Sequence, residues 1–261
     1  MGIRVVAIDW SGAVQGATRK IWLAEVVDGR LVRLERGRDR NAVAAHLKEH
    51  ATLHPEVVIG LDFAFSLPAW YLRRRGWANA RALWAAANCE ADAWLRACEC
   101  PFWGRAGKRR PNLGEHSHFR RTELAAPAAL GIKPKSVFQI NGGGTIGTGS
   151  LRGMRLLHEL SAARFSIWPF DPPGWPRVVE IYPRLLTGPV VKKIAAARRA
   201  YLATHYPDLG EQMTDRAASS EDAFDAAVSA LVMAASLPDL VALSPSTDDE
   251  AILEGLIWHP A

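Results

Sequence analysis

Residues 3–36 decide the fold of this chain, and they read IRVVAIDWSGAVQGATRKIWLAEVVDGRLVRLER. Three segments within this stretch are rich in β-branched and other apolar residues, which favours strands over 3–9, 20–27 and 31–36. Asp28-Gly29 separates the second segment from the third and is a typical two-residue hairpin turn. The stretch therefore predicts a meander of three antiparallel strands.

The segment after the meander predicts a helix and then a buried strand. Residues 39–53 are expected to form the helix, with Asp39 or Asn41 as its N-cap, and Pro55 ends it. Residues 56–62 (EVVIGLD) are a continuous apolar run of the kind found inside parallel sheets. A ribonuclease-H-like fold begins in this order, whereas a dinucleotide-binding fold does not.

The rest of the chain completes the prediction of an α/β domain. We expect residues 66–135 to be an insertion made of a helix and a long basic loop. Further helices are predicted at 78–99, 151–163, 188–206 and 221–236, the last closed by Pro238, and further strands at 136–140, 165–170 and 177–183. The expected fold is one domain over residues 1–261. It has a ribonuclease-H-like mixed sheet, antiparallel in the meander and parallel beyond it, flanked by helices.

Carboxylates stand at the ends of the apolar segments. Asp9, Asp62 and Glu180 each end a predicted strand. Asp222 and Asp225 lie three residues apart at the start of the last helix, and therefore share one of its faces. A carboxylate at the end of a buried strand is costly unless a cation meets it. Convergence of these groups at one edge of the sheet would make an all-oxygen site for Mg²⁺ or Mn²⁺.

Several segments together resemble one protein family. They are AIDWSG (7–12), IGLDFAFSLP (59–68), FRRTE (119–123), SVFQINGGGTIGTGSLRGM (136–154), VVEIYPRLL (178–186) and SEDAFDAAVSA (220–230). The chain resembles the bacterial and archaeal family called domain-of-unknown-function 429, usually described as predicted ribonuclease-H-like nucleases. The resemblance implies a mixed sheet flanked by helices, with acidic residues at strand ends and on the last helix.

This pattern predicts a divalent-metal-dependent hydrolase that cleaves phosphodiester bonds of nucleic acid. Metal ions in such enzymes hold the attacking and leaving oxygens, and rigid strand ends suit their ligands. The expected metal ligands are Asp9, Asp62, Asp222 and Asp225, and the expected catalytic residues are Asp9, Asp62, Glu180 and Asp225.

A glycine-rich run at residues 142–150 keeps a second class of function open. Gly142, Gly144 and Gly147 satisfy the G-x-G-x-x-G pattern, and Gly144, Thr148 and Ser150 could contact phosphate or simply form a tight turn. Ser11 follows the first-strand Asp9, as in the phosphate-binding hairpins of actin-like proteins and sugar kinases. An ATP-dependent phosphotransferase of that type is therefore the alternative.

Basic residues favour a polyanionic partner. The formal net charge is +5, and Arg109, Arg110 and Arg120 lie in a stretch that also contains Trp103 and Phe119. Nucleic acid is the predicted partner, with a solvated loop as the other interpretation. A third class, a non-catalytic nucleotide or RNA-binding protein, would use this loop without metal.

Other features of the chain are weaker. A zinc site would draw on Cys98, Cys100, His116 and His118, although their C-x-C and H-x-H spacings are unusual. The three cysteines do not form a disulfide scaffold, no stretch is long enough to span a membrane, and the amino terminus reads as a strand and not a signal peptide. We therefore expect a cytoplasmic protein without membrane contact, and no motif identifies a protein partner.

Overall fold

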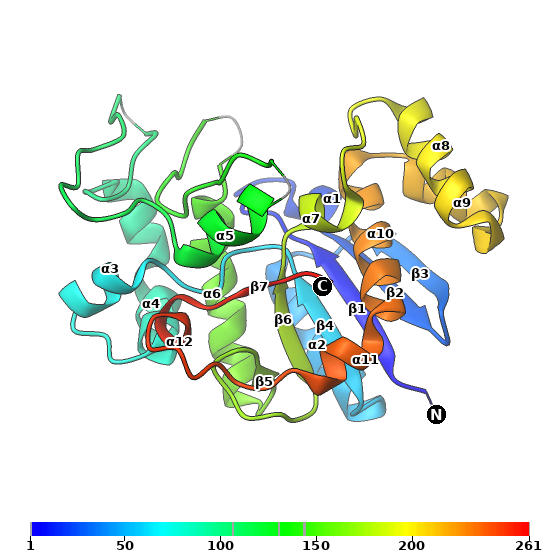
Figure 1. The fold of residues 1–261 in the computed structure, drawn as a ribbon, viewed down its shortest axis with the longest axis horizontal. Coiled ribbons are helices and arrows are strands. Elements are labelled where there is room, and N and C mark those ends of the chain that lie inside the picture. Colours follow the sequence, from blue (N-terminus) through cyan, green and yellow to red (C-terminus); the bar gives the residue numbers. More distant parts are fainter. Residues whose placement is uncertain (1, 106, 130, 143–144, 261) are drawn as a thin grey trace. The chain divides into compact units, whose positions relative to one another are not determined.

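The computed structural model describes residues 2–105, 107–129, 131–142 and 145–260, and it shows a mixed α/β protein with a seven-stranded sheet (Figure 1). The chain forms two compact units. The first comprises residues 1–62, 175–243 and 258–261, and the second comprises residues 63–174 and 244–257. In the described part, no helix has both the length and the apolar character that crossing a membrane requires.

The first unit contains the predicted meander and the strands that follow it. Its strands are β1 (Arg4–Asp9), β2 (Trp22–Val27), β3 (Arg30–Arg36), β4 (Val57–Leu61) and β6 (Arg177–Ile181). Its helices are α1 (Ala17–Lys20), α2 (Arg40–Leu53), α7 (Pro183–Thr187), α8 (Ala195–His205), the 3-10 turn η1 (Pro207–Leu209), α9 (Glu211–Ala218), α10 (Glu221–Ala235) and α11 (Leu237–Ala242).

The strands of this unit lie in the order β3-β2-β1-β4-β6. β2 pairs antiparallel with both β1 and β3, whereas β1, β4 and β6 run parallel. Asp28 and Gly29 have φ angles of 48° and 76°, so the hairpin turn has positive φ at both positions, as the Asp-Gly pair predicts. The mixed sheet predicted from residues 3–62 is confirmed.

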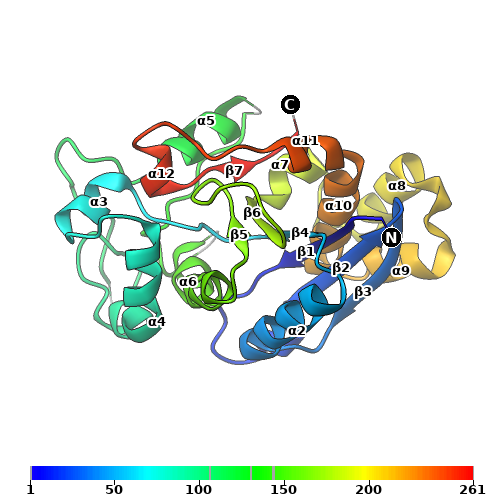
Figure 2. The same ribbon diagram turned by 90° about the horizontal axis from the view of Figure 1, so that it is seen from below.

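Helices α2 and α10 cover opposite faces of this sheet (Figure 2). On one face, Glu25 of β2 is hydrogen bonded to His50 of α2 over 2.8 Å. On the other face, a Cβ atom on Gly60 of β4 would lie 2.5 Å from the sulfur of Met233 of α10. Glycine at position 60 therefore lets α10 approach the sheet closely. Alternation along β1 assigns Ala7 and Asp9 to the α10 face, because Ala7 pairs with Gly60.

The second unit is mainly helical. Its elements are α3 (Ala69–Arg74), α4 (Ala80–Ala97), α5 (Arg121–Ala129), α6 (Gly147–Ala162), the two-residue strand β5 (Ser166–Ile167) and α12 (Ala251–Glu254). In the two-residue strand β7 (Ile257–Trp258), Ile257 is the last residue of this unit and Trp258 belongs to the first. α4 packs against α6, and the apolar side chains of Leu83 and Trp84 on α4 and of Leu157 on α6 are buried.

Three sequence-based predictions of elements are wrong. Residues 136–140 form no strand, and only an isolated bridge joins Gln139 to Trp103. The helix predicted at 188–206 begins only at Ala195. Gly188 has a φ angle of 64°, which is not helical, and residues 188–194 follow an irregular path. Pro238 does not close α10: it stands in the first turn of α11, where its missing N–H costs no hydrogen bond.

Candidate carboxylate site

The parallel pair β1 and β4 places two of the predicted carboxylates next to each other. Asp9 is the last residue of β1, and Asp62 follows the last residue of β4. Ile8 lies opposite Leu61, and the N–H of Asp62 donates to the carbonyl of Ile8 over 3.1 Å. Both carboxylates therefore lie at the same edge of the sheet.

The amino end of α10 supplies two more carboxylates. Ser220 is the N-cap of this helix, and its hydroxyl accepts a hydrogen bond from the N–H of Ala223 over 3.0 Å. Asp222 in the first turn is therefore not needed as the cap, although its charge suits the positive end of the helix dipole. Asp225 lies about one turn further along, on the same helix face.

Burial and mutual repulsion raise the pKa of these carboxyls. The pKa of Asp9 lies well above its usual range because the group is buried and because Asp62, Asp225 and Asp222 are close enough to repel it. Burial, with a further contribution from Asp225, raises the pKa of Asp62 to about 8. Burial also raises the pKa of Asp225 and of Asp222. We call these four residues the carboxylate cluster.

Lys192 supplies a positive charge to the cluster. Its ammonium donates to both carboxylate oxygens of Asp225, at 2.8 Å and 2.6 Å. The same charge opposes the rise in the pKa of Asp9 and of Asp62. Sequence reasoning missed this residue, because it lies within the helix predicted at 188–206, whereas the helix begins only at Ala195. No signal in the sequence pointed to Lys192, which lies well beyond the end of β6 at Ile181.

Glu180 borders the cluster on the side of Asp62. It is buried in β6, and its negative charge is a smaller cause of the raised pKa of Asp62. Glu180 pairs with Leu61, and Leu61 lies on the opposite face of β4 from its neighbour Gly60. Because Asp9 shares the face of Gly60, the side chain of Glu180 lies on the face opposite to that of Asp9. Glu180 therefore adds negative charge near Asp62, but its side chain lies on the face of the sheet opposite to that of Asp9.

The loop after β1 is held in place by a cation from α2. The guanidinium of Arg40 donates to the carbonyls of Ser11 and Ala13, at 3.1 Å and 2.9 Å. The hydroxyl of Ser11 accepts from the N–H of Ala13 over 3.2 Å, which stabilises a tight turn. The contact of the Ser11 hydroxyl within this turn accounts for a serine at position 11, and no bound phosphate is needed to explain it.

The donors of the carboxylate cluster suit a hard divalent cation. All are carboxylate oxygens, and burial together with mutual repulsion raises the pKa of Asp9 and of Asp62 although Lys192 opposes the rise. Among the residues that the structure describes, no three His, Cys, Asp or Glu side chains stand together as a metal-holding group. Lys192 covers both oxygens of Asp225. The chemistry of the cluster therefore fits Mg²⁺ or Mn²⁺, while the present arrangement has a lysine at one of the expected ligands.

We expect Asp62→Asn to raise the melting temperature of the metal-free protein at pH 8. Because folding raises the pKa of Asp62 from 3.8 to about 8, the folded state binds more protons than the unfolded state between these values, and its stability falls as the pH rises through them. Removal of the charge should raise the melting temperature by roughly 4–8 °C at pH 8 in EDTA. The gain should shrink at pH 5, where Asp62 is already protonated.

The control for this experiment is Asp208→Asn, which makes the same change at an exposed position of the first unit. It should leave the melting temperature within about 1 °C. A lower melting temperature for Asp62→Asn at pH 8 would contradict the electrostatic description of the cluster.

The glycine-rich run at residues 142–150 lies in the second unit, where its last residues form the start of α6. Gly144 lies outside the described residues. Gly147 opens the helix, and a Cβ atom there would lie 2.3 Å from the carbonyl of Val137, so no larger residue fits. The hydroxyl of Thr148 donates to the carbonyl of Ile140 over 2.6 Å. Ser150 is fully buried, donates to the carbonyl of Ile146 over 2.9 Å and accepts from the N–H of Ala64 over 3.0 Å. These contacts within the fold account for both hydroxyls.

The arginines predicted to bind substrate differ in their surroundings. Arg109 and Arg110 are exposed, and the guanidinium of Arg110 lies 5.8 Å from the ring centre of Trp103 and 5.3 Å from that of Phe119. Two other basic residues of the loop, Arg105 and Lys108, donate to carbonyls at the carboxyl end of α4. The loop is thereby anchored while Arg109 and Arg110 remain available to a ligand.

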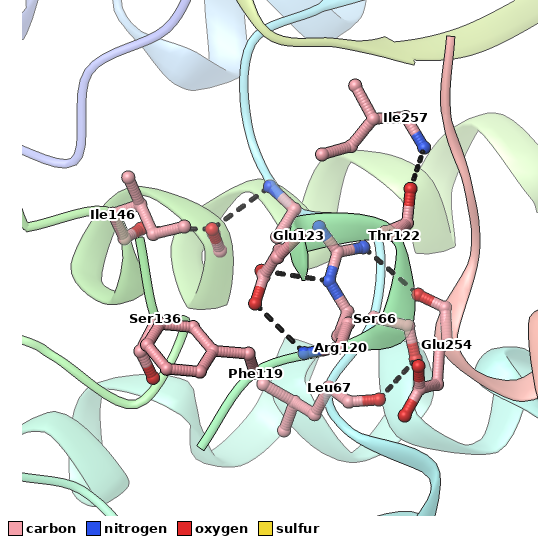
Figure 3. A network of polar contacts seen from close by, with 12 residues as sticks. Ser66, Leu67, Phe119, Arg120, Thr122, Glu123, Ser136, Ile146, Glu254 and Ile257 are labelled. Atoms are coloured by element: carbon pink, nitrogen blue, oxygen red, sulfur yellow. Dashed lines mark hydrogen bonds and ion pairs between the residues drawn. The ribbon is translucent and has the colours of Figure 1, made fainter. Parts of the chain in front are cut away.

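Arg120, by contrast, is an interior residue of the second unit (Figure 3). Its Nε donates to Glu123 over 3.0 Å, its N–H donates to the same carboxylate over 3.0 Å, and its Nη1 donates to the carbonyl of Glu254 over 3.0 Å. The carboxylate of Glu254 accepts from the backbone N–H of Ala69 over 2.8 Å. This position favours a structural role for Arg120 over substrate contact.

The residues of the zinc alternative do not assemble into a metal site. Cys98 is buried and Cys100 is exposed. His116 stacks on Trp70 with ring centres 4.5 Å apart, and His118 is hydrogen bonded to the carbonyl of Pro111 over 2.9 Å. Among the residues that the structure describes, these four side chains form no metal-holding group, so zinc has no support here.

The chain is thus a mixed α/β protein with a partly buried group of carboxylates at the carboxyl edge of its parallel strands. The chain belongs to the family described as "Protein of unknown function (DUF429)", whose model matches residues 8–250. The family membership predicted from the motifs is thereby confirmed, and the match includes the whole carboxylate cluster. No curated protein and no solved structure matches the chain.

Proposed function

We propose that this protein is a divalent-metal-dependent nuclease with a ribonuclease-H-like fold. The strand order β3-β2-β1-β4-β6 supports the fold assignment, because β2 runs antiparallel to β1 and β3 whereas β1, β4 and β6 run parallel. The observation that carries the activity is the carboxylate cluster. Asp9 is buried, Asp62, Asp222 and Asp225 are half-buried, and repulsion among these groups raises the pKa of Asp9 and of Asp62. Such an arrangement costs folding free energy and is typical of functional sites.

Asp9, Asp62, Asp222 and Asp225 are the residues that would hold Mg²⁺ or Mn²⁺. A bound ion of this kind polarises a phosphoryl oxygen and lowers the pKa of a water molecule, which supplies the chemistry of phosphodiester hydrolysis. The rigid strand ends at Asp9 and Asp62 fix two ligands. Burial raises the pKa of Tyr182, and the negative charges of Asp62 and Asp225 raise it further. The phenol of Tyr182 therefore stays protonated and can donate a hydrogen bond.

The basic loop supports nucleic acid as the substrate class. Arg109 and Arg110 are exposed cations, and the aromatic rings of Trp103 and Phe119 lie beside Arg110. Cations that neutralise phosphates and aromatic rings that stack on bases are the two elements of single-strand binding. The phosphotransferase alternative has less support, because the contacts of Ser11, Thr148 and Ser150 are explained by the fold itself.

The test is a cleavage assay on single- and double-stranded DNA and RNA. We expect cleavage with Mg²⁺ or Mn²⁺, none in EDTA, and none for Asp9→Asn with either metal. Metal should also raise the melting temperature of the wild-type protein but not of Asp9→Asn, because a ligand that binds only the folded state stabilises it. Saturable ATP binding without cleavage would favour the phosphotransferase. Metal-independent binding without cleavage would favour the non-catalytic binder.

Replacement of Arg109 and Arg110 by methionine should weaken nucleic-acid binding and flatten its dependence on salt. The slope of log affinity against log salt should fall by roughly 1 to 2, because one or two fewer phosphates are neutralised. The affinity is measured in EDTA at several salt concentrations, so that cleavage does not interfere. The double variant Arg30→Met/Arg96→Met removes two exposed cations elsewhere and should keep the wild-type slope. Equal slopes for the two double variants would show that the loop does not bind nucleic acid.

A further inference from the structure

Lys192 is positioned by contacts of its own backbone. It lies in the irregular segment between α7 and α8, where its N–H donates to the carbonyl of Val190 over 3.0 Å. Its carbonyl accepts from the guanidinium of Arg198. Arg198 is buried and also donates twice to the carbonyl of Ala218 at the end of α9, at 2.9 Å and 2.7 Å. A buried arginine thus holds the backbone at Lys192 in place.

The side chain of Lys192 completes the site electrostatically. Its ammonium is largely shielded from solvent, with 16% of the side chain exposed, and it contacts both oxygens of Asp225, whose side chain is 14% exposed. Because charges interact strongly where water is largely excluded, one ammonium at this position opposes the repulsion among all members of the cluster. Removal of Lys192 would leave Asp225 buried without its cation.

A divalent cation at Asp225 would need the oxygens that Lys192 now contacts. Lysine nitrogen carries three donors and no acceptor, so a protonated Lys192 cannot itself be a ligand. Two positive charges at one carboxylate also repel each other. Binding of a metal ion at Asp225 therefore competes with the contact between Lys192 and Asp225.

We propose that Lys192 is the resident counter-cation of the carboxylate cluster, and that a divalent cation must displace its ammonium from Asp225 in order to bind. This inference rests on the proposed metal-dependent function of the site. Lys192 is accordingly a positioning and specificity-determining residue: it stabilises the metal-free protein and sets a threshold concentration for metal loading.

The test measures binding of Mn²⁺ alone by isothermal titration calorimetry. Lys192→Met should bind Mn²⁺ about 10-fold more tightly than the wild-type protein, because no competing cation remains. Lys193→Met is the matched control, since it makes the same change at the next, exposed residue and should bind Mn²⁺ as the wild-type protein does. Lys192→Gln serves as a second variant if Lys192→Met does not fold.

The second measurement is thermal unfolding in EDTA. Lys192→Met should melt roughly 5 °C below Lys193→Met, because Asp225 then lacks its partner, and saturating Mn²⁺ should abolish this difference.

Two results would overturn the inference, and they differ in what they say about the proposed function. If the wild-type protein binds Mn²⁺ and Lys192→Met binds it no more tightly than Lys193→Met, the competition is wrong while the metal site stands. If neither the wild-type protein nor Lys192→Met binds Mn²⁺, both the metal site and the competition are wrong.

Discussion

Asp225→Asn should lower metal-dependent cleavage by about 10³-fold or more while leaving the affinity for nucleic acid within about twofold of the wild-type value. The substitution keeps the size of the side chain but removes an anionic oxygen ligand. It also removes the partner of Lys192, whose ammonium contacts both oxygens of Asp225. Since a catalytic carboxylate acts on the transition state, the loss should fall on kcat and not on binding.

The measurement is single-turnover cleavage with saturating enzyme, together with binding in EDTA. Asp208→Asn makes the same chemical change at an exposed position and should cleave at the wild-type rate. If Asp225→Asn keeps more than a tenth of the activity, Asp225 is not part of the catalytic site. The proposal would then depend on Asp9 and Asp62 alone.

Arg120→Met should destabilise the protein by about 3–5 kcal/mol, which is a large fraction of the stability of a typical domain. The side chains of Arg120 and Glu123 are 1% and 3% exposed, and they form an ion pair over 3.0 Å. Methionine fills most of the volume but leaves the buried carboxylate of Glu123 without the guanidinium of Arg120. Urea denaturation monitored by circular dichroism measures the change in the free energy of unfolding.

Two controls separate this structural role from substrate binding. Arg110→Met, at an exposed position, should change the free energy of unfolding by less than about 0.5 kcal/mol. The double variant Arg120→Met/Glu123→Met should recover part of the loss, because the buried negative charge is then removed together with the guanidinium. Normal stability of Arg120→Met combined with weaker nucleic-acid binding would return Arg120 to the substrate-binding residues.

Local interactions explain why much of the fold could be predicted from the sequence. The Asp28-Gly29 turn joins adjacent strands, and the N-caps Asp39 and Ser220 bond to backbone N–H groups three residues further along the chain. Such features depend on neighbours in the sequence and on backbone conformation, both of which can be read directly from residue types. The error at residues 136–140 has a similar explanation: an apolar, β-branched segment needs a partner strand, and only an isolated bridge to Trp103 is present.

The positions of Asp9 and Asp62 were also predictable. Each follows an apolar strand, and the carboxyl ends of neighbouring parallel strands meet at one edge of a sheet. Asp225 was placed by its spacing from Asp222 on a helix whose cap, Ser220, precedes it. The sequence thus determined which elements carry the acidic groups and in which order they follow one another.

Only the tertiary structure decided which charged groups meet. Lys192 and Asp225 are 33 residues apart, and their contact depends on the path of the segment before α8, which Arg198 holds from the end of α9. Arg120 looked like its exposed neighbours in a basic stretch, yet it pairs inside the protein with Glu123 and with the carbonyl of Glu254. The pairing and burial of a charge depend on groups brought together by the whole fold, and residue type and spacing do not report them.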